Sequence, residues 1–108
     1  MRRGTTPTII MNVAGDDLDE YNIYVTLKQD ALKIIKKTWQ ITREAGDDPD
    51  TCILSIPFTQ EETLSLKAGR EASIQLRVIA PDGIVKESGI ISLGLVDEVL
   101  QEGVLSYV

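Results

Sequence analysis

Two runs of alternating apolar and polar residues, joined by a short polar corner, constrain the fold of this chain more than any other stretch. Residues 51–80 read TCILSIPFTQEETLSLKAGREASIQLRVIA. Every second residue is apolar in each run, as expected for strands that bury one face. The apolar positions are Cys52, Leu54, Ile56 and Phe58 in the first run and Ala72, Ile74, Leu76 and Val78 in the second. The pattern therefore predicts two strands that each contribute one face to a core.

The corner between the two runs has the residues of a helix start and a helix stop. Thr59 and Glu62 are spaced as a capping box, in which the hydroxyl and the carboxylate satisfy each other's backbone donors. Gly69 closes the corner, where a backbone with positive φ is most easily adopted by glycine. We expect one short helical turn near residues 59–66.

The rest of the chain repeats the strand pattern. Strands are predicted over 7–14, 21–29, 84–87 and 90–96, with turns rich in Gly, Asp and Pro at 15–20, 45–50 and 81–83. Ile23, Val25 and Leu27 define the inward face of the second strand. Gly89 and Gly94 allow a bulge in the last one. About seven to eight short strands indicate an all-β, antiparallel β-sandwich that forms a single domain over residues 7–108, preceded by a flexible arm over residues 1–6.

Residues 31–44, ALKIIKKTWQITRE, fit two interpretations. Leu32, Ile35 and Trp39 are at helical spacings, and several good helix formers lie between them. The many β-branched and aromatic residues and the neighbouring strands favour two short strands with a kink near Lys36–Lys37. The second of these strands would form a hairpin with residues 51–58. A helix over the same residues is the alternative.

Composition excludes several classes of function. The chain has 108 residues, a net charge of −6, one cysteine and no histidine. An acidic chain lacks the basic patch that nucleic acid or an anionic membrane requires, and no apolar run approaches the roughly 20 residues of a membrane span. The N-terminus carries no signal-peptide pattern, so we expect synthesis in the cytoplasm. The missing histidine removes the usual general base and metal ligand, and we predict no enzyme, no catalytic residues and no cofactor.

Acidic and thiol groups are the candidates for chemistry, and each has a simpler interpretation. Acidic residues in two predicted loops could bind Ca²⁺ or form a glycosidase-like pair, but Asp is also a common turn residue and the spacing matches no calcium loop. These residues are Asp16, Asp17, Asp19, Glu20, Asp47, Asp48 and Asp50. Cys52 lies on the inward register, which favours a buried hydrophobic role over a reactive thiol. We predict no metal site.

Aromatic and basic side chains are candidates for binding. Tyr24, Trp39 and Tyr107 could stack on sugar rings, although a core of this size also needs aromatic residues. A local basic face is either the protection of an edge strand against unwanted pairing or half of a charge-complementary subunit contact. It comprises Lys28, Lys33, Lys36 and Lys37. The apolar C-terminal residues 104–108, VLSYV, are either the last core strand or a segment that reaches a neighbouring subunit.

Four short motifs carry a resemblance to a known group of proteins. They are TQEETL (59–64), KAG (67–69), IQLR (74–77) and the turn PDG (81–83), and the opening RRGTTPTI with YVTLKQ (24–29) adds to them. With these motifs the chain resembles small prophage-encoded proteins of the tail and baseplate region. Those proteins are similar to the N-terminal immunoglobulin-like domain of the siphophage baseplate upper protein. The resemblance runs from about Arg3 to about Gly103, and residues 31–44 depart from it by being more basic and apolar.

The resemblance implies an immunoglobulin-like sandwich that is a non-enzymatic structural component of a phage or prophage virion. It brings no catalytic motif, so no functional residues are carried over. The expected partners are copies of the chain itself, in a homo-oligomer, and other phage structural proteins, in the tail or baseplate region of the virion. The sandwich class and Tyr24 leave a carbohydrate-binding or adhesin-like module as the alternative function.

Overall fold

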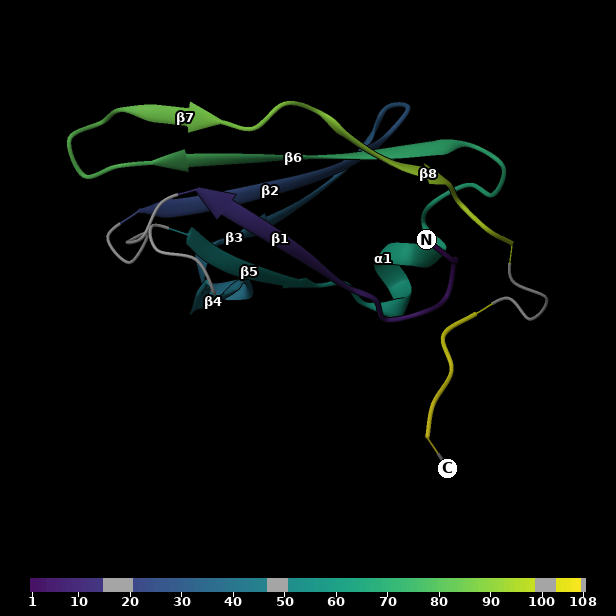
Figure 1. Cartoon of the computed structure of the whole chain (residues 1–108). Helices are drawn as coiled ribbons and strands as arrows, with labels where there is room; N and C mark the ends of the chain where they lie inside the picture. Colours follow the sequence, from purple (N-terminus) through teal and green to yellow (C-terminus); the bar gives the residue numbers. More distant parts are fainter. Residues whose placement is uncertain (15–20, 47–50, 99–102, 108) are drawn as a thin grey trace.

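The computed structural model describes residues 1–14, 21–46, 51–98 and 103–107, and these residues form an all-β, antiparallel protein. In this part of the chain eight strands form two sheets, and one short α-helix lies in the connection between two strands. Figure 1 shows the two sheets as layers whose strands cross each other rather than running side by side. The antiparallel two-sheet architecture predicted from the sequence is confirmed.

The smaller sheet has three strands in the order β1-β5-β4. Its strands are β1 (Thr8–Ala14), β5 (Thr51–Pro57) and β4 (Thr42–Ala45). The central strand β5 pairs with β1 along its whole length and with β4 over four residues. The outer edges of this sheet are therefore β1 and β4. The hairpin predicted between the second part of 31–44 and residues 51–58 is the β4–β5 pair.

The larger sheet has β2 (Asn22–Gln29) and β6 (Glu71–Ile79) at its centre and β3 (Leu32–Lys37) at one edge. The opposite edge is shared by β7 (Val85–Glu87) and β8 (Ile91–Leu95), which pair with the two ends of β6. The register shifts by one residue between Ala72 and Ser73, opposite Gly94, whose φ is +78°. The bulge expected from the glycines is thus at Gly94.

The core lies between the two sheets and is built from the alternate residues that the sequence indicated. Ile23, Val25 and Leu27 are completely buried on β2, and Leu54 and Ile56 face them from β5. The core is completed by residues from β6, the corner, the segment after β8, β5 and the residue before β4, namely Ala72, Ile74, Leu76, Val78, Phe58, Leu66, Val96, Cys52 and Ile41. Burying such side chains contributes roughly 1.5–3 kcal/mol each. The period of two therefore decided which face of each strand is buried.

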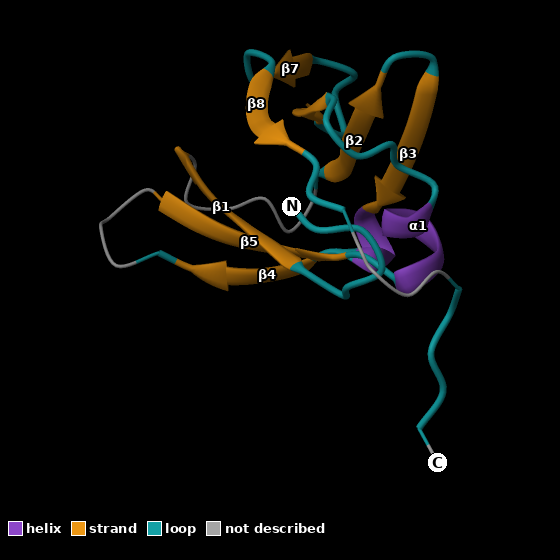
Figure 2. Ribbon diagram, turned by 90° about the vertical axis from the view of Figure 1, so that its right-hand side faces the viewer, coloured by secondary structure: helices purple, strands orange, loops and turns teal. Residues whose placement is uncertain are grey.

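The corner between β5 and β6 holds α1 (Gln60–Leu64), which lies at one end of the two layers (Figure 2). The backbone N–H of Glu62 donates to the Thr59 hydroxyl, and the Glu62 carboxylate accepts from the backbone N–H of Thr59. This is the capping box expected from the sequence. Gly69 has φ +76°, also as expected, and its N–H donates to the carbonyl oxygen of Val96.

Residues 31–44 form two strands rather than a helix. β3 ends at Lys37, a short 3-10 turn, η1 (Thr38–Gln40), follows, and β4 begins at Thr42. The Thr38 hydroxyl accepts a hydrogen bond from the N–H of Ile23. This side chain replaces the backbone carbonyl that β3 would offer to β2 if the strand continued past Lys37. The chain then crosses to the other sheet, which is why the strand breaks directly after Lys36–Lys37.

The two terminal segments differ from the expectations. Residues 1–3, expected to belong to a flexible arm, are docked beside the segment that follows β8: Arg2 forms a parallel bridge with Asp97, and Met1 packs against the core. The interpretation of 104–108 as the last core strand is wrong for the described residues, because Val104, Leu105 and Tyr107 are exposed and form no strand.

Candidate functional site

The outer face of the five-stranded sheet forms a groove of about 620 Å³. Its floor is polar, because Thr26 on β2 and Ser73 and Gln75 on β6 point away from the core at alternate positions. Ile35 on β3 and Ile90 before β8 form apolar rims on opposite sides. A polar floor between apolar rims is suited to an extended ligand that carries hydroxyl or amide groups.

Three cations line this groove. Lys28 lies directly opposite Lys33 in the β2–β3 register, and Arg77 follows on β6. Within the described ranges no carboxylate lies at ion-pair distance from these three side chains. Two carboxylates, Asp30 and Glu71, also line the groove. Arg70 neutralises Asp30 at 2.8 Å, whereas Glu71 adds a negative charge beside the three cations. Like charges directly opposite each other destabilise a strand pair, so an anionic ligand group beside Lys28 and Lys33 would relieve this repulsion.

Lys36 does not belong to the basic face to which the sequence assigned it. Its side chain is buried and points to the other side of β3, where Nζ lies 2.6 Å from Glu62 Oε1 and 5.2 Å from the centre of the Phe58 ring. Burial raises the pKa of Glu62, but hydrogen bonds from Lys36 and from the backbone of Thr59 outweigh it, and the net pKa is lowered from 4.5. The pair therefore ties β3 to α1 and has a structural role.

Two of the remaining lysines match the expected protection of an edge strand, whereas Lys28 lies on the central strand β2 and does not. β3 is the edge of its sheet, and Lys33 and Lys37 are exposed on it. The Nζ of Lys37 lies 5.5 Å from the centre of the Trp39 ring. Positive side chains on an edge strand discourage pairing with another chain.

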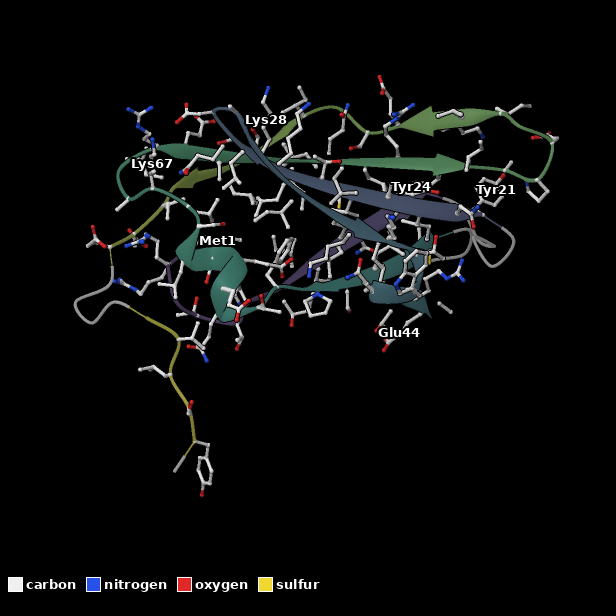
Figure 3. All side chains as sticks on the ribbon, turned by 180° about the vertical axis from the view of Figure 1, so that it is seen from behind. Met1, Tyr21, Tyr24, Lys28, Glu44 and Lys67 are labelled. Carbon is white, nitrogen blue, oxygen red and sulfur yellow. The ribbon has the colours of Figure 1, made fainter. Side chains whose placement is uncertain are left out.

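The three aromatic candidates do not form one platform. Tyr24 lies on the outer face of β2, next to Arg77 and Lys37 in the register, and Trp39 follows directly in η1. Figure 3 shows Tyr24 on the same sheet as Lys28 but farther from α1. Tyr107 is in the C-terminal segment, which extends beyond α1 and away from both sheets (Figure 1). Tyr24 therefore lies beside the groove, whereas Tyr107 does not.

The other chemical candidates give no site. The acidic residues proposed for Ca²⁺ lie in 15–20 and 47–50, outside the described residues. Among the residues that the structure describes, no group of three His, Cys, Asp or Glu side chains could hold a metal ion. Cys52 is a free thiol that is 6% exposed, in agreement with the buried hydrophobic role expected for it.

A second surface feature is the open edge of β1. The N–H of Phe58 donates to the carbonyl oxygen of Pro7 at 2.9 Å, and the register then continues in alternation along β1. Because antiparallel neighbours bond at every second residue, Ile9, Met11 and Val13 direct their backbone groups to β5, and Thr8, Ile10 and Asn12 direct theirs to the open edge. Ile10 is 69% exposed. The edge therefore offers a row of backbone donors and acceptors without a partner among the described residues.

The C-terminal segment is attached to α1 by its backbone. The Gln60 side-chain amide donates to the carbonyl oxygen of Leu105 and accepts from its N–H, at 3.1 and 2.8 Å. Val104 lies beside a hollow of about 420 Å³ that is also lined by Phe58 and Thr59. Val104, Leu105 and Tyr107 remain exposed, and they form an apolar segment on the surface of an acidic chain.

Sequence reasoning missed two polar anchors. Gln29 is 3% exposed, and its amide binds the backbone of Lys67 and Arg70 in the connection between α1 and β6. Arg3 donates to the carbonyl oxygens of Leu66 and Leu64 at the end of α1. The sequence does indicate that Gln29 is buried, because position 29 continues the inward-facing positions 23, 25 and 27 of β2. Nothing local to Arg3 indicates its contacts.

No helix among the described residues is long and apolar enough to cross a membrane. No protein-family model and no curated protein matches the chain.

Proposed function

We propose that this protein is a non-enzymatic structural component of a phage or prophage virion, in the tail or baseplate region. It acts by assembly with copies of itself and with other phage structural proteins, after synthesis in the cytoplasm of the bacterial host. The motif combination of TQEETL, KAG, IQLR and PDG supports the phage origin. The observation that carries the assembly role is the uncharged, unpaired edge of β1, accompanied by the exposed apolar segment at the C-terminus.

The strand order supports an immunoglobulin-like topology for this component. In an immunoglobulin fold the strands A, B, E and D form one sheet, and C, F and G form the other, to which some members add C′. The order β1-β5-β4 corresponds to B-E-D, and the order β3-β2-β6 followed by β7 and β8 corresponds to C′-C-F-G. In this correspondence the described residues supply no strand at the position of A, beside β1.

Mass spectrometry of phage particles tests this function. Particles would be purified after induction of the prophage in the strain that carries the gene, and an abundant cytoplasmic protein would serve as the control for contamination. We expect the chain in the particles at a copy number comparable with that of tail proteins and far above the control. Its absence from particles that contain the tail proteins would exclude a role in the virion.

A carbohydrate-binding module is the second candidate, and the groove on the five-stranded sheet is the observation that favours it. The polar floor, the three cations and the adjacent Tyr24 offer hydrogen bonds, charge and a stacking surface to an extended, anionic saccharide. A glycan array with the wild-type protein tests it. The variant Tyr24→Ala should lose the binding, whereas Tyr107→Ala, an exposed tyrosine remote from the groove, should retain it. An array without ligands, or equal binding by both variants, would rule this function out.

A further inference from the structure

The open edge of β1 differs from the other strand edges in having no protection against pairing. β1 reads TIIMNVA and contains no charged residue, no proline and no bulge. Every other described edge has a protective feature: lysines on β3, Arg43 and Glu44 on β4, a length of three residues in β7, and the bulge at Gly94 in β8. An uncharged edge of seven residues without a bulge is a template for another strand.

We propose that β1 pairs with β1 of a second copy of the chain, so that two three-stranded sheets join into one continuous sheet. This inference rests on the assembly function proposed above and names the surface and the partner. The antiparallel register that uses the whole strand is centred on Met11 and pairs Thr8 with Ala14 and Ile10 with Asn12 of the second copy. These are the positions that direct their backbone groups to the open edge, and each such pair exchanges two hydrogen bonds, about eight in all.

The same register matches side chains as well as backbone groups. It places Ile9 opposite Val13 and Met11 opposite Met11, and these three side chains are the half-buried, inward-facing ones of β1. Each copy would thus extend the apolar face of the other at the place where its own sheet ends. A shift of one residue would set inward-facing side chains opposite outward-facing ones. The pairing can therefore shift only by an even number of residues if the apolar faces are to stay on the same side.

The lack of charge on β1 suits an interface between two copies of an acidic chain. Two copies that each carry a net charge of −6 repel each other, and β1 is a contact surface that brings no charge to the interface.

The expected dimer is weak in isolation. A strand pair buries less than the roughly 800 Å² per partner of a standard interface, so we expect dissociation in the micromolar range or above. Many copies held together in a particle would strengthen such a contact through their effective concentration. The edge therefore suits a subunit that assembles in number.

Proline substitution provides a test that is specific for the backbone. In Ile10→Pro the lost N–H points to the open edge and not to β5, so the strand keeps its internal ladder. The matched control is Ile35→Pro on β3. Ile35 is also an exposed isoleucine in the middle of an edge strand. The N–H of Ile23 donates to Thr38, so the odd-numbered residues of β2 direct their backbone groups toward β3. Their partners on β3 are even-numbered, and the N–H of Ile35 therefore points to the free side of β3. Circular dichroism confirms that both variants fold.

Sedimentation velocity from micromolar to millimolar concentration is the measurement. We expect the wild type and Ile35→Pro to rise from 11.9 kDa to twice that mass, and Ile10→Pro to remain a monomer throughout. A wild type that stays monomeric, or an Ile10→Pro variant that dimerises like the wild type, overturns the inference. Either result leaves the proposed function open to its own test, because presence in particles is measured independently of dimerisation in solution.

Two further variants keep the test decisive. Met11→Cys should form a disulfide-linked dimer under mild oxidation and Ile35→Cys should not, because residue 11 meets its own copy at the two-fold axis in the close, non-hydrogen-bonded type of pair. Failure of Met11→Cys to cross-link overturns the proposed β1–β1 register. If Ile10→Pro does not fold, this cross-linking result replaces it as the test of the dimer. Truncation after Gly103 tests the rival occupant: a dimer that is lost on removing 104–108 would assign the edge to the C-terminal segment instead.

Discussion

Replacement of Gln29 by leucine tests the buried amide that connects β2 to the α1–β6 corner. The side chain makes three hydrogen bonds: Nε2 donates to Lys67 O at 2.8 Å and to Arg70 O at 3.2 Å, and Oε1 accepts from the N–H of Lys67 at 2.6 Å. Leucine has a similar size but can make none of them. At about 1 kcal/mol net for each hydrogen bond, Gln29→Leu should lower the free energy of unfolding by about 3 kcal/mol.

Such a loss is large for a domain of this size. Total stabilities are typically about 5–15 kcal/mol, and about 3 kcal/mol corresponds to a decrease in Tm of roughly 10–20 °C. Urea denaturation should be followed by far-UV circular dichroism, because Trp39 is 78% exposed and its fluorescence would report the unfolding poorly. The matched control is Gln75→Leu on the outer face of β6, where one hydrogen bond to Ser88 O is lost, and the cost should be about 1 kcal/mol or less.

Gln29→Glu separates hydrogen bonding from packing. An ionised carboxylate can still accept from the N–H of Lys67, but it faces the carbonyl oxygens of Lys67 and Arg70 without a proton to donate. The variant should therefore be strongly destabilised at neutral pH and recover part of its stability as the carboxyl protonates on acidification. A Gln29→Leu variant within about 0.5 kcal/mol of the wild type, or a Gln29→Glu variant that does not respond to pH, would refute the assignment of this amide as an anchor.

Three further predictions concern the core and the corner. The lowered pKa of Glu62 means that its contribution to stability is fully present above the unfolded pKa of about 4.5 and is lost as the pH falls through the lower folded pKa. In Glu62→Gln the acid side of a pH–stability curve from urea denaturation should therefore be flatter than in the wild type. An unchanged curve would contradict this. Leu54→Ala should cost about 2–5 kcal/mol in urea denaturation because Leu54 is completely buried between the sheets, and a cost below about 1 kcal/mol would mean that the sheets close over the cavity. Gly69→Ala should cost about 1–2 kcal/mol of backbone strain at φ +76° with no steric clash, since no atom lies within 4 Å of the added Cβ, and a neutral substitution in thermal denaturation would contradict that source of strain.

Much of the fold follows from local patterns in the sequence. The period of two in 21–29, 51–58 and 70–80 identified the strands and their buried faces, because alternation of side chains is a property of a strand by itself. The corner also follows locally: Thr59 and Glu62 satisfy each other three residues apart, and Gly69 adopts a backbone that other residues avoid. The strands on both sides of Lys37 were predictable from their β-branched residues, whereas the break between them accompanies the crossing from one sheet to the other.

The open edge and the buried polar anchors were decided by tertiary structure. Lys36 looked like a surface lysine, and its long aliphatic chain allowed it to reach Glu62 across the interface between a sheet and a helix. Gln29 and Arg3 bind carbonyl oxygens 38 to 63 positions away, and no local pattern reports such distances. The β-rich residues of 7–14 predicted that β1 is a strand. Only the strand order shows that its outer edge has no neighbour in the described chain, because an edge is defined by pairing between distant segments.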